Sequence, residues 1–544
     1  MRYLSENKRE DMRMKKRTAA RSMAALMGAA MVLTACGGGS TTAPTAGASS
    51  GGETQTASES AESGKITKTD IIVGQASDIV TLDPAGQQDT TSGVLMKHAY
   101  STLLDVDNEG KVVPDLAESY EMKSDTEYVF KLREDACFWD GTPVTAQDVK
   151  FSLDRAKGMP KTKSNTSKIE EVTVNGDHEV TIKLTEPYAA FKTIVTQHNL
   201  SILSEKAVTE AGDSYGDVDN LLGSGPFKVT EWVPNDHYTL VRNDNYWGEM
   251  PIATSITCRV IPEGSARTIA LEAGEIDVVW SVDPTDCANV ESNPDVKLLS
   301  QPSTGIDYVG MNTQKEKFSD KRVRQAINYA LDKQAFVDTI IEGRGLVANS
   351  YINAAIPGWT DEVEAYPYDP EKAKELLAEA GYPDGFECSI FVNGDLRTCS
   401  AQILQAQLAD VGIKVDISTY EWGALLDTLN AGEHEMFLLG WSNTSFDPDG
   451  STYQLFYSGN HGATGNRAFF SNDKVDELIL SAQRESEESK RMELYKELQF
   501  VLHEESPWCP LYYKENNVGV RADLKGFTLH AGAQHYLGNC HYEE

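Results

Sequence analysis

Apolar and polar residues alternate with a period of two in several short runs, and each such run predicts a β-strand with one buried face. The run 71–73 (IIV) leads into a polar turn at 75–78, and in 128–132 (YVFKL) every second residue is apolar and shares one face. The runs 172–174 and 180–184 flank Asn175-Gly176, a pair typical of tight turns, and therefore predict a β-hairpin.

Helical patterns lie between these strands. Asp369 and Pro370 form a helix start and Gly381 the matching stop. A second helix is predicted over about 400–411, followed by an alternating strand at 413–417, and a third helical run covers 473–504 with a break near 485–489. Strands and helices in mixed order predict an α/β fold, and a chain of 544 residues is long enough for two or more lobes.

The first 65 residues do not follow this pattern. A basic stretch at 15–21 precedes an apolar run at 23–33, which is too short to cross a bilayer but has the length of a signal-peptide core. The following Leu33-Thr34-Ala35-Cys36 resembles the bacterial lipobox, which implies a lipoprotein signal peptide over 1–35 and a lipid on Cys36. The alternatives are a secretory segment with a chance cysteine, or an inserted anchor, and translation could start at Met14 instead of Met1. Residues 36–65 are rich in small polar residues and predict a flexible tether.

Composition and charge narrow the range of partners. Hydrophobic residues make up 40% of the chain and charged residues 24%, as in soluble globular proteins. The formal net charge of −34 argues against nucleic acid as a partner, because its phosphates would be repelled.

Seven cysteines follow Cys36 without the spacing of a zinc site, so most are expected to be buried free thiols. Disulfides between Cys388 and Cys399 or between Cys258 and Cys287 stay open as alternatives.

Several motifs, in order along residues 66–544, resemble those of the bacterial extracellular solute-binding proteins of family 5, the dipeptide-, oligopeptide- and glutathione-binding lipoproteins of ABC importers. They are 128–150 (YVFKLREDACFWDGTPVTAQDVK), 223–227 (GSGPF), 242–247 (RNDNYW), 311–314 (MNTQ), 323–330 (VRQAINYA), 368–377 (YDPEKAKELL), 419–423 (TYEWG) and 505–508 (ESPW). Most of these residues are expected to hold the fold. Asp140-Gly141 is typical of a turn, and Thr145 with Asp148 of a helix cap.

The resemblance implies an α/β fold of the two-lobed periplasmic-binding-protein type (type II, cluster C), with an extra β-rich subdomain in the first lobe. The implied limits are lobe I at 66–307 with the subdomain at 109–222, a hinge crossing at 308–312, lobe II at 313–510, and a second crossing with return to lobe I at 511–544. Ligand would bind between the lobes and favour their closed state, which the importer recognises.

The resemblance also implies ligand contacts. Ser77 and Asp78 follow the first strand, where relatives line the cleft, and Arg397 lies where relatives have a carboxylate-binding arginine. In the second lobe the corresponding segment is Trp441, Ser442, Asn443 and Thr444. Peptide-binding members carry an Asp for the ligand's α-ammonium at the position of Thr444, so this departure favours a displaced or blocked amine. The alternatives are packing of Trp441 within its own lobe and a surface role for Arg397.

The predicted function is capture of short peptides or peptide-like solutes for delivery to ABC permease and ATPase subunits, by a monomer held at the membrane by its lipid. No GxSxG, HExxH or Walker motif is present, so neither enzymatic activity nor a cofactor is expected. One alternative is a nickel, haem or other non-peptide solute, because His530, His535, Cys540 and His541 gather near the end of the chain. The other is a lipoprotein receptor or chaperone without transport.

Overall fold

The structure is a computed structural model that describes residues 65–544. The predicted signal peptide, the lipidation site Cys36 and almost all of the predicted tether therefore lie outside the described residues. Within the described range no helix is long and apolar enough to span a bilayer.

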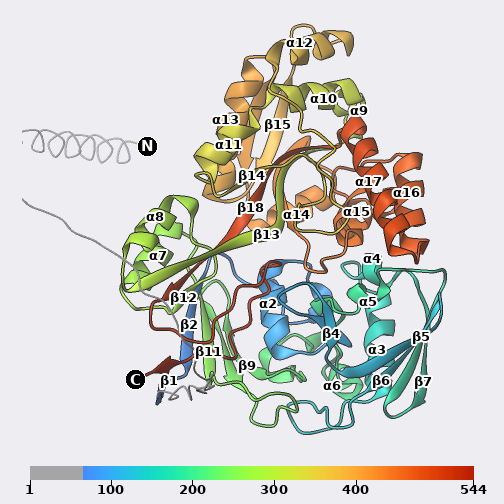
Figure 1. The fold of residues 1–544 in the computed structure, drawn as a ribbon, viewed down its shortest axis with the longest axis vertical. Helices are drawn as coiled ribbons and strands as arrows, with labels where there is room; N and C mark the ends of the chain where they lie inside the picture. Colours follow the sequence, from blue (N-terminus) through green and yellow to red (C-terminus); the bar gives the residue numbers. More distant parts are fainter. Residues whose placement is uncertain (1–64) are drawn as a thin grey trace, which may run out of the picture. The chain divides into compact units, whose positions relative to one another are not determined.

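An eleven-stranded sheet runs through this part of the chain (Figure 1). Its spatial order is β16 (Lys414–Thr419), β15 (Glu387–Val392), β17 (Met436–Ser442), β13 (Val296–Met311), β18 (Trp508–Arg521), β12 (Val278–Val279), β2 (Asp70–Gln75), β11 (Ser255–Val260), β10 (His237–Arg242) and β9 (Phe227–Val233), with β14 (Gly345–Val347) on β18. The predicted strands at 71–73 and 413–417 are confirmed as β2 and β16.

The long antiparallel strands β13 and β18 connect the two ends of this sheet. At one end they pair with β12, and at the other with β17 and β14. Their register shifts between Pro302 and Ile306 and again between Asp307 and Tyr308. We call residues 65–302 and 515–544 the first half and residues 303–514 the second half. The lobe limits drawn from the family resemblance stay predictions.

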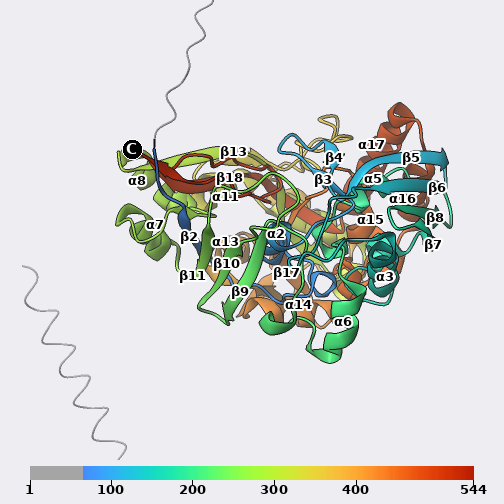
Figure 2. The same ribbon diagram turned by 90° about the horizontal axis from the view of Figure 1, so that it is seen from below.

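The first half holds a separate four-stranded antiparallel sheet, with α3 packed across β7 and β8 (Figure 2). Its order is β5 (Ala117–Ser124), β6 (Glu127–Leu132), β8 (Glu179–Leu184) and β7 (Ile169–Gly176), which confirms the predicted strand at 128–132 and the hairpin. Thr145 and Asp148 form the predicted capping box at the start of α3 (Ala146–Lys157).

The other elements of the first half surround these two sheets. The helices are α2 (Thr90–Ala99), α4 (Lys163–Thr166), α5 (Phe191–Ile194), α6 (Glu205–Ala211), α7 (Gly264–Glu272) and α8 (Pro284–Ser292), with short 3₁₀ turns η1 (Pro84–Gly86), η2 (His198–Leu200), η3 (Gly212–Ser214) and η4 (Val218–Asn220). The small strands β3 (Leu104–Val106) and β4 (Val112–Pro114) pair with each other, and β1 (Ile66–Lys68) pairs with β19 (Tyr542–Glu543) near the end of the chain.

Helices cover the sheet of the second half. They are α9 (Glu316–Ser319), α10 (Lys321–Ala330), α11 (Lys333–Ile340), α12 (Pro370–Glu379), α13 (Gly394–Ala409), α14 (Trp422–Asn430), α15 (Asp449–Phe456), α16 (Asp473–Arg484) and α17 (Glu488–Glu505), with turns η5 (Ser458–Asn460) and η6 (Gly462–Thr464). The break predicted near 485–489 is confirmed between α16 and α17. Asp369 caps α12 as predicted, and Gly381 follows it at φ +94°.

The predicted start of α13 is wrong. The helix begins at Gly394, not near 400, so Arg397 lies inside its first turns. The segment 394–399 (GDLRTC) lacks the apolar spacing that marked the rest of the helix, and this is why the pattern missed it. Asp395 in the first turn suits the positive end of the helix dipole.

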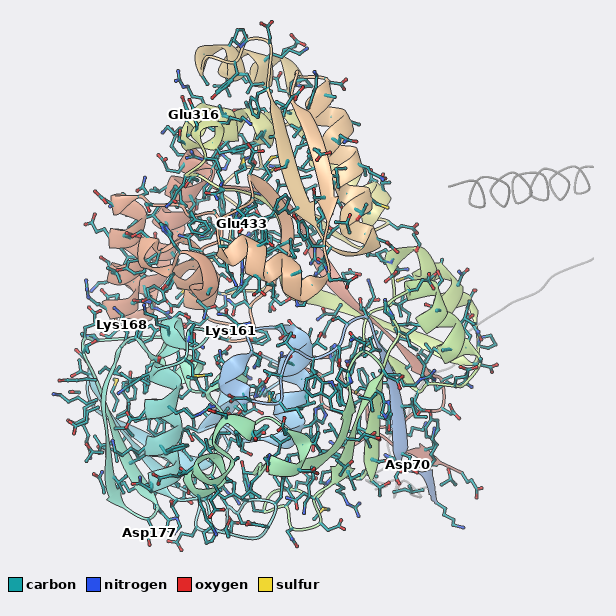
Figure 3. The ribbon with its side chains drawn as sticks, turned by 180° about the vertical axis from the view of Figure 1, so that it is seen from behind. Asp70, Lys161, Lys168, Asp177, Glu316 and Glu433 are labelled. Carbon is teal, nitrogen blue, oxygen red and sulfur yellow. The ribbon has the colours of Figure 1, made fainter. Side chains whose placement is uncertain are left out.

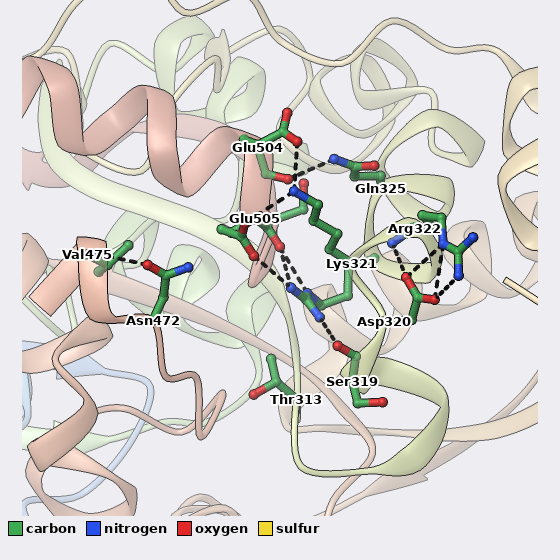
Figure 4. A network of polar contacts seen from close by, with 12 residues as sticks. Thr313, Ser319, Asp320, Lys321, Arg322, Gln325, Asn472, Val475, Glu504 and Glu505 are labelled. Carbon is green, nitrogen blue, oxygen red and sulfur yellow. Dashed lines mark hydrogen bonds and ion pairs between the residues drawn. The ribbon is translucent and has the colours of Figure 1, made fainter.

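Two of the family-like motifs meet in the second half and serve the fold (Figure 4). The buried Arg324 of α10 donates to the backbone carbonyl of Glu505 at 3.0 and 2.6 Å and to that of Phe318 at 2.8 Å. Nearby, Lys321 pairs with the side chains of Glu504 and Glu505. The motifs at 323–330 and 505–508 therefore fix the end of α17 against the start of α10.

All seven cysteines of the described range are free, and five of them are buried. The expectation of buried thiols is confirmed for Cys258, Cys287, Cys388, Cys509 and Cys540, and neither disulfide that the sequence left open is formed.

Candidate functional site

The two halves touch through a band of side chains from the four-stranded sheet and its helices on one side and α15 to α16 on the other. Tyr188 donates to the Asp449 carboxylate at 2.6 Å, and both side chains are buried. Gln454 donates to Asn165 at 2.7 Å, and the amide of Ala189 donates to the carbonyl of Gln483 at 2.7 Å. The structure is therefore one in which the halves are closed on each other.

Ion pairs extend this band to the rim. Lys168, labelled in Figure 3, pairs with Glu186 of the first half, and Glu186 also accepts from Arg484 of the second half. A further pair between the halves joins Arg344, before β14, to Glu291 of α8 at 2.7 Å. Arg484 and Glu291 are the exposed partners of these pairs, whereas Tyr188 and Asp449 are both buried.

A charged cluster lies in the second half, at the carboxyl ends of β15 and β17. Asp307 of β13 is 6% exposed, and its carboxylate accepts from Lys514 at 3.2 Å and from Tyr512 at 3.1 Å. Burial opposes ionisation of Asp307, but Lys514 and then Arg397 outweigh it and hold the pKa of this carboxyl below its usual value. The carboxyl ends of strands are where α/β proteins bind their ligands.

Arg397 adds a second cation to this cluster. Its Nη1 donates to Asn393 at 2.7 Å, while its Nε is buried and has no hydrogen-bond partner among residues 65–544. Two cations, Arg397 and Lys514, thus act on the single carboxylate of Asp307. A buried donor without a partner is costly, so this cluster has capacity for one more anion.

Gly305 lets three side chains beside this cluster approach the backbone closely. A Cβ at residue 305 would come within 3.1 Å of Ser303 Oγ, 3.2 Å of Lys514 Cε and 3.4 Å of Ser442 Oγ. Two hydroxyls and the end of the Lys514 side-chain stem therefore pack against one backbone position that has no side chain. Ser442, at the end of β17, pairs directly with Gly305.

The other predicted residues of this segment are largely engaged within the protein. Trp441 packs on Ile306 and Tyr513, and its Nε1 donates to the carbonyl of Gly450 at 3.0 Å. The side-chain amide of Asn443 donates to the carbonyl of Asp447 and to the hydroxyl of Ser451, and it accepts from the backbone amide of Ser445. It thereby fixes the loop that follows β17. Thr444 reaches across to the first half and donates to Gln197 at 2.9 Å.

Ser77 and Asp78 lie in the first half, after β2. The Asp78 carboxylate accepts from the indole of Trp232 at 3.2 and 3.1 Å and from the amide of Asn235 at 2.8 Å. It therefore holds the turn between β9 and β10. Ser77 is half-buried, and its hydroxyl lies 3.4 Å from that of Thr91.

Comparison with known proteins decides the family. The profile of the bacterial extracellular solute-binding proteins, family 5, matches residues 111–463. The chain belongs to this family. It is 32% identical to the glutathione-binding protein GsiB of Shigella boydii, over 85% of this chain and 92% of that protein.

Solved structures agree with the fold. The periplasmic binding protein DppA of Helicobacter pylori, in complex with the peptide STSA, superposes with a TM-score of 0.83 at 28% identity, covering 88% of this chain and 99% of that one. The oligopeptide-binding protein AppA of Bacillus subtilis, bound to a nonapeptide, gives 0.81 at 26% identity, covering 89% and 100%. The predicted two-lobed α/β fold is confirmed.

Two residues of this solute-binding protein's charged cluster were missed from the sequence. Asp307 interrupts an apolar run, GIDYVGM at 305–311, and Lys514 ends one, LYYK at 511–514. A lone charge inside a buried strand was the signal that could have found them. The structure brings Arg397 and the segment 441–444 to the same half, with Ser77 and Asp78 in the other, and the ligand contacts of all seven stay predictions.

The histidines near the end of the chain serve the backbone of this solute-binding protein. His530 Nδ1 accepts from the amides of Gly532 at 3.1 Å and Gln534 at 3.3 Å, and His535 Nδ1 accepts from the amide of His530 at 3.0 Å. Within the described range, no group of three or more His, Cys, Asp and Glu side chains could hold a metal ion.

Proposed function

We propose that this solute-binding protein captures short peptide-like molecules with a free carboxylate between its two halves and delivers them to the permease and ATPase of an ABC importer. The observation that carries the proposal is the excess cation beside Asp307. Arg397 has an unpartnered buried Nε, and with Lys514 it offers two cations to one internal carboxylate. A ligand carboxylate supplies the missing anion.

The length of the ligand follows from the same segment. Gly440 lies beside Asp307, since a Cβ there would come within 2.2 Å of its Oδ1, and Thr444 contacts the first half four residues later. Four extended residues reach ~14 Å. A ligand that runs along this segment is therefore about two to four residues long, and the glutathione bound by the GsiB relatives is a tripeptide-sized molecule of this kind.

The proposal includes a hinge and an anchor. The lobes follow the predicted limits, 66–307 with 511–544 and 313–510, and the register shifts of β13 against β18 are the natural places to bend. The lipid on Cys36 holds the monomer at the extracytoplasmic face of the membrane. The role of the protein in this proposal is binding, not catalysis.

Isothermal titration calorimetry tests the carboxylate site. Glutathione and mixed-sequence tripeptides with a free carboxylate are compared with the same tripeptides carrying a carboxy-terminal amide. Arg397→Ala is expected to weaken binding of the free acids by ~2–5 kcal/mol, because a desolvated carboxylate is left without its partner. The amides are expected to bind weakly to both proteins.

The matched control is Arg242→Ala, because Arg242 pairs with the exposed Asp244 on the first half. Equal affinities of wild type and Arg397→Ala for the free acids would remove Arg397 from the site. Failure of glutathione and every peptide to bind wild type would overturn the assignment of the solute.

A further inference from the structure

A small polar cavity lies between the halves, next to Thr444. Its volume is about 10 Å³, room for one water-sized group. The side chains that matter here are Lys97, Asp105, His198, Thr444, His530 and Gln534. They come from α2, β3, η2, the loop after β17 and the segment that follows β18. Only Thr444 belongs to the second half, so closure of the halves adds one wall to a cavity that the first half largely builds.

The loop that carries His530 is tied to both strands that link the halves. The amide of Thr304 in β13 donates to the carbonyl of Ala531 at 3.2 Å. Asn516 of β18 donates to the same carbonyl at 2.8 Å. The position of His530 is therefore set by the hinge strands and not by a free loop.

His530 presents an unused donor to this space. Its ring is 2% exposed, and its Nδ1 accepts from two backbone amides, so Nδ1 carries no proton. Burial, followed by Lys97, lowers the pKa of His530 to about 4, so the neutral ring holds its proton on Nε2. That Nε2 has no hydrogen-bond partner of normal geometry in the described residues, although the Asp107 backbone is near enough to act on the pKa.

Gln534 presents an unused acceptor. It is 5% exposed, and its Oε1 makes no hydrogen bond within residues 65–544. A donor and an acceptor, both more than nine-tenths buried, thus line one cavity without partners. Leaving each of them unpaired costs about 1–3 kcal/mol, so a group that satisfies both is strongly favoured.

The cavity carries no net charge. Lys97 and Asp105 pair with each other at 3.0 and 3.1 Å, and the lysine is only 12% exposed. Burial also lowers the pKa of His198 to about 3, so this second imidazole is neutral. Because Lys97 and Asp105 already neutralise each other, neither an ammonium nor a carboxylate would find a free counter-charge here, and an ammonium would also meet the His530 Nε2–H donor to donor.

We infer that this cavity is a subsite for an uncharged end group of the ligand, a hydroxyl or an amide, which accepts from His530 Nε2 and donates to Gln534 Oε1. The inference rests on the proposed function, which directs the ligand's carboxylate to Arg397 and Lys514 and leaves the opposite end for the cavity. The protein then selects peptide-like solutes whose amino end is blocked or replaced.

Competition binding followed by mass spectrometry tests this inference. Three mixed-sequence tripeptide libraries share a free carboxylate and differ only at the amino end, which is a free ammonium, an N-formyl amide or a hydroxyl. The formyl and hydroxyl libraries are expected to bind wild type at least about 10-fold more tightly than the ammonium library. Of these two libraries, the one that binds more tightly shows whether an amide or a hydroxyl fills the cavity.

His530→Asn removes the Nε2 donor, while its Oδ1 can still accept from the amides of Gly532 and Gln534. Binding of the uncharged libraries is expected to weaken about 5-fold or more, with the ammonium library unchanged. His535→Asn is the matched control in the same loop, because His535 does not line the cavity. It is expected to leave the ratio between libraries at the wild-type value.

Gln534→Glu tests the site independently of His530, because an added carboxylate should shift preference toward the ammonium library. The inference is overturned if wild type binds the ammonium library as tightly as the other two libraries. It is also overturned if His530→Asn folds and keeps the wild-type ratio of affinities between libraries, because the cavity would then hold only a structural water. Failure of all three libraries to bind would instead overturn the proposed function.

Discussion

Closure of the halves depends on the hydrogen bond from Tyr188 to Asp449. The two residues come from opposite halves, both are buried, and the oxygens lie 2.6 Å apart. Gln483 also donates to Asp449 at 2.9 Å, but from the same half. Tyr188→Phe therefore removes only the contact across the interface and leaves Asp449 partly satisfied.

The size of the effect follows from the charge of Asp449. Burial, followed by the neighbouring Asp447, raises the pKa of Asp449 to about 6, so at pH 7 the carboxylate is mainly ionised. A hydrogen bond to a charged group contributes about 1.5–3 kcal/mol. We expect Tyr188→Phe to shift the equilibrium toward the open state by that amount, and ligand affinity to fall by up to about 10–150-fold if the free protein is mainly open.

Calorimetric titration gives the affinity, and small-angle X-ray scattering gives the radius of gyration with and without ligand. The matched control is Tyr366→Phe, whose hydroxyl donates to the carbonyl of His503 at 2.7 Å within the second half. Both variants are expected to lose unfolding free energy, but only Tyr188→Phe should lose affinity. Wild-type affinity in Tyr188→Phe, or an equal loss in the control, would refute the role of this bond in closure.

Four further outcomes are expected. Cys36→Ser should release the protein from the membrane fraction, and continued lipid labelling of that variant would contradict lipidation at Cys36. Arg491→Met should lower the unfolding free energy by ~3–5 kcal/mol in urea titrations, because it leaves the buried Asp447 without the cation that now lies 2.5 and 2.8 Å away, and a loss below 1 kcal/mol would contradict this. The unfolding free energy should fall between pH 6.5 and 5, because six imidazoles with pKa values lowered to about 3 to 4 by burial bind protons only when the protein unfolds. The carboxyls of Asp449 and Asp115, with pKa values raised by burial to about 6 and 7, act in the opposite sense, and the net difference of about three protons gives ~4 kcal/mol per pH unit. A pH-independent urea midpoint over this range would contradict that balance; the imidazoles belong to His98, His198, His434, His503, His530 and His535. Equilibrium dialysis with nickel and zinc should show no stoichiometric binding that is lost on truncation after Ala531, and tight one-to-one binding abolished by that truncation would favour a metal solute.

The sequence by itself determined the elements whose signals are local. The alternation at 128–132, the hairpin near Asn175-Gly176, the capping pair of Thr145 with Asp148 and the helix between Asp369 and Gly381 all rely on neighbours within a few residues, and all are present. The turn of the hairpin lies at 177–178, because Asn175 and Gly176 end strand β7. The family motifs added the two-lobed fold, because many short matches agreed in their order along the chain. The start of α13 was missed where its first turns carry no apolar pattern.

The sites, in contrast, were decided by tertiary structure. Asp307 and Lys514 are 207 residues apart in sequence, and they meet because β13 and β18 are neighbours in the sheet. The cavity joins Lys97 to Gln534 through five separate elements, and the tautomer of His530 depends on two amides that its own loop brings to the ring. Local spacing encodes which strands and helices form, but strand order and closure decide which charges lose their water and which donors are left without partners.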